Sequence, residues 1–254
     1  MFRSKAKRRK RLRALPLSTE WQRFLYRAVP LVRRLPEEDR NELHGHLQVL
    51  LSEKHFEGAG GLEITDEMEF TVCAQAAVLL LHRNTDYFPK LITILIYPGP
   101  YGVRKPIRNE QGIVADVLET RAGESWTWGT VVLSWENVQR DLARTHGTEN
   151  VILHEFAHQL DAGSGAMDGA PLLSEERLRK QWPQALSQAF ARLESAAQAH
   201  IRTVLRPYGA KNPSEFFAVA TEAFFQQPML VRQSEPQLYH ALCQYFKQDP
   251  AKWA

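Results

Sequence analysis

The sequence has few cysteines, no long apolar run and no secretion signal. Its two cysteines, Cys73 and Cys243, do not form a C-x-x-C pair, which fits reduced buried thiols better than a disulfide scaffold. The longest apolar runs, at 76–81 and 91–97, are far shorter than the ~20 residues of a membrane-spanning helix. No apolar segment typical of a signal peptide follows the N-terminus. We therefore expect a cytoplasmic protein without a membrane span.

Positive charge is concentrated in the first thirteen residues. This segment holds Arg3, Lys5, Lys7, Arg8, Arg9, Lys10, Arg11 and Arg13. The other 24 basic residues are outnumbered by 29 acidic residues in the rest of the chain. A short run of like charges is usually a solvated terminus, so we expect residues 1–13 to be a disordered leader. Such a leader can contact nucleic acid or anionic lipid, and no contact with nucleic acid is expected elsewhere on the chain.

Apolar periodicity predicts one α+β domain, mainly helical, over residues 14–254. With 254 residues, of which 44% are hydrophobic, the chain can bury a sizeable core. Helical spacing of apolar residues covers about 14–89 and about 149–254, and strand patterns fall at about 90–136.

The predicted strands form a small mixed sheet in the middle of the chain. They are Leu91–Tyr97, Gly112–Leu118 and Thr130–Trp135. This order of helices, sheet and further helices is similar to the zincin plan, in which an edge strand lies beside the catalytic cleft. We expect Thr130–Trp135 to be that edge strand.

Residues 151–161 read V-I-L-H-E-F-A-H-Q-L-D and contain the H-E-x-x-H pattern of a catalytic zinc helix. Helix positions four apart lie about 6 Å apart on one face, so His154 and His158 can bind one cation. Glu155 then projects beside the metal, where it can take a proton from a bound water. The alternative is a hydrogen-bonded core cluster. The apolar neighbours favour the metal site, because buried His and Glu side chains without partners are costly.

Catalytic zinc usually has three protein ligands and one open position. Asp161 and Ser164 stand where metzincins have Gly and His, which excludes that arrangement. The segment 212–222 offers Glu215 and Glu222, which lie on one helical face. Glu215 could instead complete a capping box, and Glu222 could be an exposed acid or an acceptor for a histidine ring. Spacing alone leaves both candidates open.

Two further polar residues lie near these motifs. Asp161 is in the last helical turn, where the dipole disfavours an acid. It is interpreted either as an acceptor for the N–H of a zinc-binding histidine or as a solvated helix end. Tyr208 lies seven residues before Glu215 and could donate to an oxyanion, although spacing alone favours an ordinary loop tyrosine.

Several motifs together resemble the Mlc titration factor A family. They are L-H-E-F-A-H-Q-L-D at 153–161, Tyr208 with N-P-S-E-F-F-A-V at 212–219, L-I-Y-P-G-P at 95–100, and Y-F-K-Q-D-P at 245–250. Members of this family are zinc peptidases of the gluzincin type with a catalytic domain similar to that of anthrax lethal factor. The resemblance covers about Trp21–Pro250 and offers no counterpart for the basic leader.

The resemblance also implies roles for individual residues. It implies that His154, His158 and Glu215 bind one zinc ion per chain, that Glu155 is the general base, and that Tyr208 is the oxyanion donor. Glu222 is then left to support a ligand from outside the metal's coordination sphere.

The resulting hypothesis is a cytoplasmic, aminopeptidase-like zinc peptidase acting on peptide bonds. The resemblance further implies binding of an Mlc-type transcriptional repressor of sugar phosphotransferase genes. The alternative is a non-catalytic protein that sequesters such a regulator and contains a structural metal. The presence of Glu155, with no fourth protein ligand evident in the sequence, favours catalysis.

Overall fold

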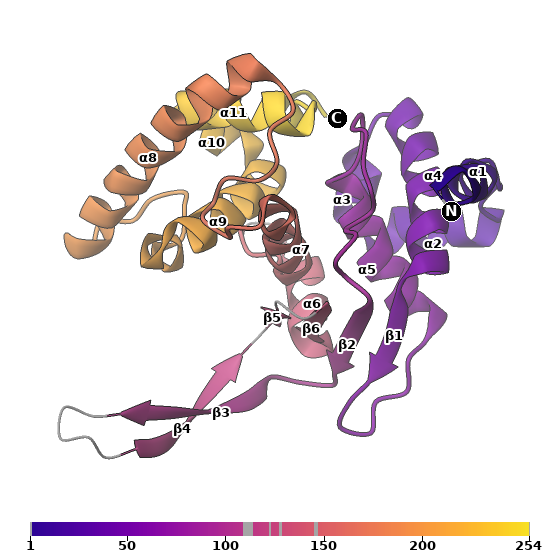
Figure 1. Cartoon of the computed structure of the whole chain (residues 1–254), viewed down its shortest axis with the longest axis horizontal. Coiled ribbons are helices and arrows are strands. Elements are labelled where there is room, and N and C mark those ends of the chain that lie inside the picture. The colour runs from indigo at the N-terminus through magenta and orange to yellow at the C-terminus, as the bar shows by residue number, and fades with distance from the viewer. Residues whose placement is uncertain (1, 109–113, 122, 127–128, 145–146, 254) are drawn as a thin grey trace.

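The computed structural model describes residues 2–108, 114–121, 123–126, 129–144 and 147–253. Helices predominate, and a small sheet lies between an N-terminal and a C-terminal group of helices (Figure 1). The predicted mainly helical architecture with a small mixed sheet is confirmed. Within the described ranges, no helix combines the length and apolar character that crossing a bilayer demands.

The N-terminal helices pack around the hairpin of α4 and α5. They are α1 (Phe2–Arg13), α2 (Thr19–Ala28), α3 (Pro30–Arg34), α4 (Glu37–Glu53) and α5 (Asp66–Val78). Helix α5 begins where the Thr65 side chain accepts a hydrogen bond from the Met68 N–H at 3.3 Å, as an N-cap does.

Residues 2–13 form helix α1 instead of the disordered leader that the sequence predicts. Arg9 donates to the two carboxylate oxygens of Glu53 at 2.9 and 2.7 Å, and it also pairs with Asp86. The Arg9 guanidinium lies over the Tyr87 ring, 4.6 Å from its centroid, and Leu12 packs against the hydrophobic core. The acids of the domain offset the repulsion between like charges along the helix, so α1 docks on α4.

A mixed sheet lies at the centre of the chain. Its strand order, among the described residues, is β1 (His55–Gly58), β2 (Thr93–Tyr97), β6 (Thr130–Ser134) and β5 (Gly123–Trp126). The first three strands are parallel, and β5 runs antiparallel to β6. Burial of Ile94 and Ile96 on alternate positions of β2 is the period-two pattern that predicts this strand. The sequence does not predict β1, because four residues are too few to show a period.

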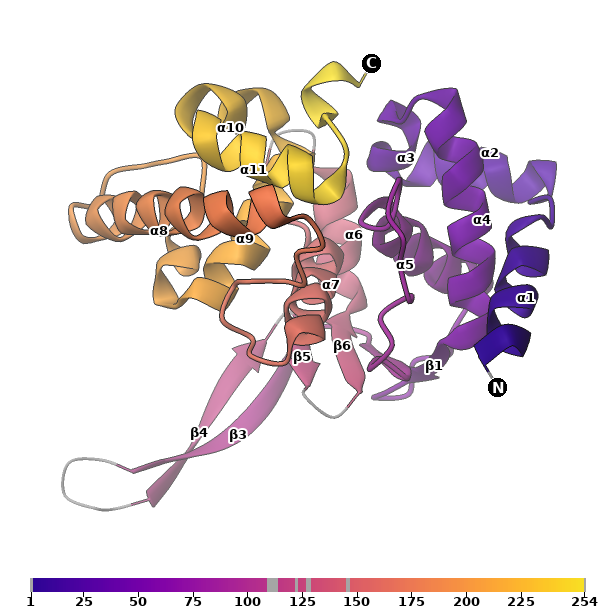
Figure 2. The same cartoon turned by 45° about the horizontal axis from the view of Figure 1, so that its top comes forward.

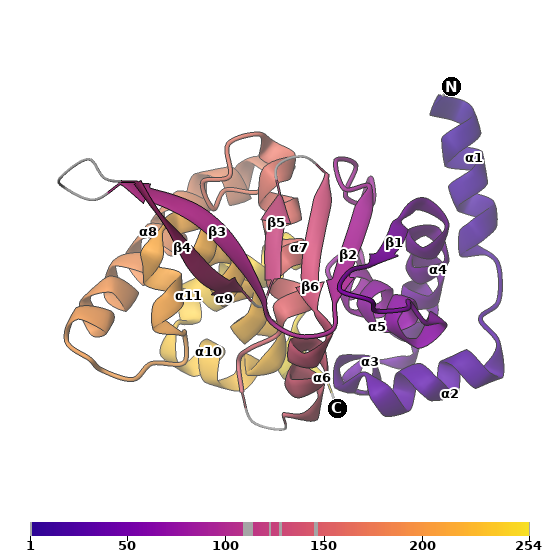
Figure 3. The same cartoon turned by 90° about the horizontal axis from the view of Figure 1, so that it is seen from below.

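The prediction that Thr130–Trp135 is an edge strand is wrong. Strand β6 lies between β2 and β5, and β5 forms the outer strand beside helix α7 (Val151–Asp161; Figure 3). The continuous apolar run V-V-L of β6 identifies a strand but does not state which strands flank it. The sequence G-E-S-W of β5 also has no such alternation.

A two-stranded hairpin projects from the body of the molecule (Figures 1 and 3). It consists of β3 (Tyr101–Arg108) and β4 (Val114–Arg121), which are antiparallel. The predicted strand Gly112–Leu118 coincides with β4 from Val114 onward, and residues 112 and 113 lie outside the described residues.

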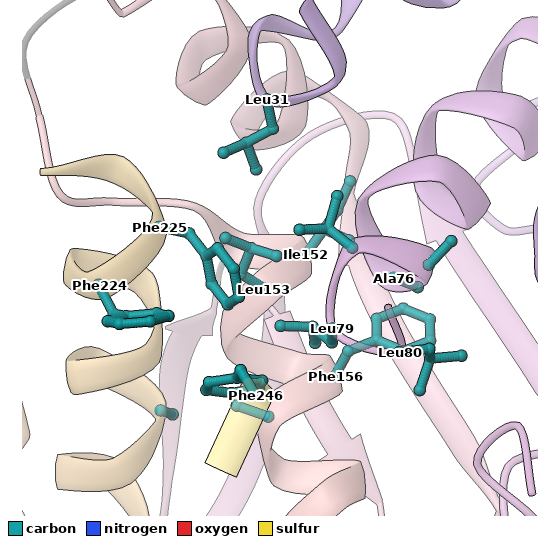
Figure 4. Packing of buried hydrophobic residues seen from close by; sticks show 14 of the residues in the cluster. Leu31, Ala76, Leu79, Leu80, Ile152, Leu153, Phe156, Phe224, Phe225 and Phe246 are labelled. Carbon is teal, nitrogen blue, oxygen red and sulfur yellow. The ribbon is translucent and has the colours of Figure 1, made fainter. Parts of the chain in front are cut away.

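Helix α7 runs through the core, between α5 and α9 (Pro213–Gln226). The remaining helices are α6 (Trp135–Ala143), α8 (Glu176–Gln198), α10 (Pro228–Ser234) and α11 (Pro236–Phe246). Helices α8 to α11 lie on one side of α7, and α2 to α5 lie on the other (Figure 2). Figure 4 shows the buried side chains that join these groups, including Ala76, Leu79, Leu80, Ile152, Leu153, Phe156, Phe224 and Phe225. Burial on nearly every side is what the apolar pattern of α7 predicts.

Candidate metal centre

Helix α7 begins at a buried N-cap and presents two imidazole rings. The side chain of Asn150 accepts a hydrogen bond from the Leu153 N–H at 3.0 Å and donates to Gln75 at 2.6 Å. Farther along α7, the four-residue spacing brings the ring centroids of His154 and His158 to 4.8 Å. Their Nε2 atoms are 3.2 Å apart. The helix therefore holds both rings as a pair, as the sequence predicts.

The start of α9 brings Glu215 to these rings. Asn212 is the N-cap and accepts from the Glu215 N–H at 2.9 Å, and Pro213 occupies the first turn. The Glu215 carboxylate itself is directed to the histidines: its Oε2 lies 3.1 Å from Nε2 of His154 and 3.3 Å from Nε2 of His158. The N-cap considered in the alternative interpretation is present, and the carboxylate nevertheless contacts the rings.

Three potential ligand atoms converge at this point, all within 4.8 Å of one another. Their closest separations are 3.1, 3.2 and 3.3 Å. Two ligands bound about 2.0–2.1 Å from a tetrahedral zinc ion are expected about 3.3 Å apart. The set of two imidazole nitrogens and one carboxylate oxygen therefore fits a zinc ion in both chemistry and spacing.

The His154 ring is oriented by Glu222 on α9. Nδ1 of His154 lies 2.8 Å from Oε1 of Glu222. The Glu222 carboxylate also accepts from the Asn150 N–H at 2.6 Å and from the Arg206 guanidinium at 2.5 Å. A carboxylate partner makes Nδ1 the donor, which leaves the lone pair of Nε2 facing Glu215. Sequence reasoning misses Arg206, because this residue belongs to none of the motifs.

The His158 ring is oriented through a hydroxyl group. Nδ1 of His158 lies 3.1 Å from Oγ of Ser214, and Ser214 donates to Oδ2 of Asp161 at 2.8 Å. The same Asp161 oxygen accepts from the Gly169 N–H at 2.9 Å. Asp161 thus supports His158 through Ser214, whereas the sequence interpretation had it accept the ring N–H directly. Sequence reasoning misses Ser214, and its position directly before Glu215 in the N-cap segment is the available signal.

With the hydrogen atoms assigned in this way, Nε2 of both rings and Oε2 of Glu215 are all acceptors. Three acceptors at these distances repel one another unless a proton or a metal cation lies between them. The geometry therefore calls for positive charge at the centre of the cluster.

Glu155 lies beside this centre and is only 3% exposed. Its Oε2 atom has no hydrogen-bond partner among the described residues. A buried carboxylate oxygen without a partner is costly, and it is expected where a metal, a water molecule or a substrate completes a site.

The pKa values of the cluster reflect burial and close charges. Burial alone lowers the pKa of His154, but the charge of Glu222 and hydrogen bonds with Glu215 and Glu222 raise it to about 10. Burial raises the pKa of Glu215, but hydrogen bonds with His154 and His158 and their charges bring it well below its usual value. Burial raises the pKa of Glu155 to about 7. The raised pKa of His154 and the lowered pKa of Glu215 both show that positive charge between the two side chains is favoured.

Tyr208 lies at the open side of the cluster, in a turn formed by Pro207–Lys211. Its hydroxyl donates to Oε1 of Glu215 at 3.1 Å, and its ring centroid is 5.9 Å from that of His154. Tyr208 is 46% exposed. The structure therefore brings together the five residues to which the resemblance assigns metal binding or catalysis, namely His154, Glu155, His158, Tyr208 and Glu215.

The family model described as glucose-regulated metallo-peptidase M90 matches residues 3–247 of this chain. The chain belongs to the M90 metallo-peptidase family. The match begins within the basic N-terminal segment, so this segment has a counterpart in the M90 family, contrary to the prediction from the resemblance.

Relatives of this M90 chain are similar over most of its length. An uncharacterized protein of Synechocystis sp. is 38% identical over 245 residues, which are 96% of this chain and 89% of the relative. Mlc titration factor A of Pectobacterium atrosepticum is 30% identical over 233 residues, 91% of this chain and 86% of the relative. Mlc titration factor A of Yersinia pestis is 28% identical over 225 residues, which are 87% of this chain and 82% of the relative.

Proposed function

We propose that this chain is a zinc-dependent peptidase in which His154, His158 and Glu215 hold one zinc ion. The observation that carries the proposal is the convergence of Nε2, Nε2 and Oε2 from these residues at 3.1–3.3 Å. Membership of a metallo-peptidase family supports it. Zinc, when bound, lowers the pKa of a coordinated water to about 7 and polarises a carbonyl group.

Glu155 is the general base in this proposal. Its Oε2 has no partner among the described residues, so it is free to accept a proton from the attacking water. Because Glu155 is not needed as a ligand, it can then transfer that proton to the leaving amine as the peptide bond breaks.

Tyr208 is the proposed hydrogen-bond donor to the oxygen of the scissile carbonyl. The phenol is half-exposed and already adjoins the cluster through its bond to Glu215. Rotation of the ring away from Glu215 frees the hydroxyl for a substrate oxygen, where a donor stabilises the negative charge that develops during attack.

The peptide substrate is proposed to bind in an extended form along β5. This strand ends the described sheet beside α7, and an outer strand can add a peptide through main-chain hydrogen bonds. Aminopeptidase-like action on short peptides is proposed from the family resemblance. A cytoplasmic location agrees with the two free cysteines, Cys73 and Cys243.

The names of the relatives support a second, compatible role. Two of them are called Mlc titration factor A, and we propose that this chain also binds an Mlc-type repressor of sugar phosphotransferase genes. The alternative is a non-catalytic protein that sequesters the repressor and carries a structural metal. A structural zinc site has four protein ligands, whereas the cluster found among the described residues has three, so the enzyme is favoured.

The decisive experiment compares wild type with Glu155→Gln after zinc loading. Metal content is measured by mass spectrometry, and cleavage is measured on free and N-blocked peptides. We expect about one zinc per chain in both proteins, with cleavage lowered by about 10²–10⁴ in the variant. Glu176→Gln, which changes an exposed carboxylate on α8, is the matched control and should cleave normally. Undiminished cleavage by Glu155→Gln would refute the proposed base. A zinc-loaded wild type that binds the repressor and cleaves no peptide would support the sequestering protein.

A further inference from the structure

Helix α1 has two faces with different electrostatic environments. On the inner face, basic side chains form ion pairs with acids of the domain: Lys5 with Asp86, Arg8 and Arg9 with Glu53, and Arg13 with Glu42. On the outer face, Lys7, Lys10 and Arg11 are exposed. Among the described residues, no carboxylate lies within ion-pair distance of these three side chains. No described residue therefore neutralises their charges.

The inner contacts hold α1 on the domain in one orientation, so its outer basic side chains face away from the domain. Arg9 binds both oxygens of Glu53 and lies over the Tyr87 ring, and Leu12 packs against the core. Residues three and four apart share a helical face, so Lys7, Lys10 and Arg11 form one cluster. We call these three residues the outer basic cluster.

The spacing of the outer basic cluster matches that of a nucleic-acid backbone. Residues 7 to 11 extend about 6 Å along the helix axis at 1.5 Å per residue. One strand of a nucleic-acid duplex carries one negative charge per about 3.4 Å of the helix axis. The three cations therefore face about two successive phosphates of one strand.

We propose that the outer basic cluster of α1 binds the phosphate backbone of a nucleic-acid duplex, independently of base sequence. The helix lies at the edge of the molecule, away from α7 and α9 (Figure 2), so a duplex bound there leaves the candidate metal centre accessible. Because the rest of the chain is acidic overall, the duplex is repelled from other surfaces and directed to α1.

A lipid surface is less well matched than a duplex. A helix that lies in a membrane interface needs a large apolar face beside its basic face. In α1 the inner-facing Leu12 is packed against the core. Among the described side chains, the exposed large apolar residue near the outer basic cluster is Leu15, which lies just beyond the end of the helix. A single leucine beyond the helix is much smaller than the apolar face that a helix in a membrane interface buries.

The test measures binding of the zinc-loaded full chain to a labelled 20-base-pair DNA duplex by fluorescence anisotropy. The variant combines Lys7→Ala, Lys10→Ala and Arg11→Ala. Alanine preserves helical propensity, and Arg8, Arg9 and Arg13 still anchor the helix. The matched control combines Arg177→Ala, Lys180→Ala and Arg202→Ala, which removes the same charge from exposed positions near the ends of α8. Circular dichroism verifies that all three proteins are folded.

We expect wild-type affinity to fall steeply between 50 and 200 mM salt. Loss of about two phosphate contacts should make the slope of log K against log salt less steep by about 1.8 and weaken binding at 50 mM salt by at least about tenfold. The control should resemble wild type. Equal weakening in both triple variants, or no binding of wild type, would overturn the proposal. Binding of wild type to phosphatidylglycerol vesicles but not to the duplex would overturn it in favour of a lipid surface.

Discussion

Nδ1 of His154 lies 2.8 Å from Oε1 of Glu222, a carboxylate that is 1% exposed and lies 68 positions later in the chain. Glu222 also binds the Asn150 N–H, which begins the helix that carries His154. One carboxylate therefore fixes both the start of α7 and the orientation of its first ring. Arg206 balances its charge from the other side.

Glu222→Gln should weaken zinc binding while preserving side-chain volume. The amide is a poorer acceptor than the carboxylate, so the His154 ring loses orientation and basicity, and we expect about 10–100-fold lower affinity. Competition with a chromophoric chelator measures this. Glu149→Gln is the control, because Glu149 contacts Arg206 at 3.7 Å without contributing to the His154 contact. Equal affinities in the two variants would contradict the role of Glu222.

Ser214→Ala should weaken zinc binding through the other ring. The change removes the hydroxyl that accepts from His158 and donates to Asp161, and it leaves the Asp161 carboxylate with one fewer donor. We expect an affinity lower by about tenfold or more. Ser214→Thr retains a hydroxyl and should recover much of the loss in the same chelator assay. If both substitutions were equally harmful, packing and not the hydroxyl bridge would be responsible.

Gly169→Ala should be more harmful than Gly165→Ala. Both glycines have positive φ angles, +78° and +97°, so alanine at either position is strained by about 1–2 kcal/mol. At Gly169 a Cβ would also overlap the carbonyl oxygen of Pro213, whereas at Gly165 it would meet no atom within 4 Å. Because Pro213 begins α9, Gly169→Ala should displace Ser214 and Glu215. Urea unfolding and zinc affinity should both show a larger loss for Gly169→Ala, and similar losses would contradict the close contact.

Arg9→Ala should destabilise the protein at neutral pH and have less effect in acid. Burial raises the pKa of Glu53, but hydrogen bonds with Arg9 and Arg8 outweigh burial and lower it below 4.5. A lowered carboxyl pKa contributes stability above the unfolded value, and this contribution is lost as pH falls through the folded value. We therefore expect a loss of about 1–2 kcal/mol at pH 7 that shrinks below about pH 4.5.

The measurement for Arg9 is urea unfolding at pH 7 and pH 3.5. Lys10→Ala is the control, since Lys10 lies on the same helix and faces outward, and it should leave stability nearly unchanged. A destabilisation by Arg9→Ala that is as large at pH 3.5 as at pH 7 would show that its packing on Tyr87, and not its pairing with Glu53, stabilises α1.

Local patterns predicted the elements that depend on neighbouring residues. The predicted zinc helix corresponds to α7, the strand at 93–97 follows its alternation, the strand at 130–134 contains a continuous apolar run, and Asn212 and Pro213 begin α9. These features follow from the periods of helices and strands and from N-cap chemistry. The docked state of α1 was not predictable from its charge run, because its partners Glu53 and Asp86 lie in distant segments.

The sequence by itself determined that His154 and His158 share one face of a buried helix, because a spacing of four residues places side chains one turn apart. Only the tertiary structure decided that Glu215 closes the cluster, that Glu222 and Ser214 orient the two rings, and that β5 is the outer strand. The His154–Glu215 contact joins residues 61 positions apart. Contacts of that range depend on how α7 packs against α9, which no local spacing encodes.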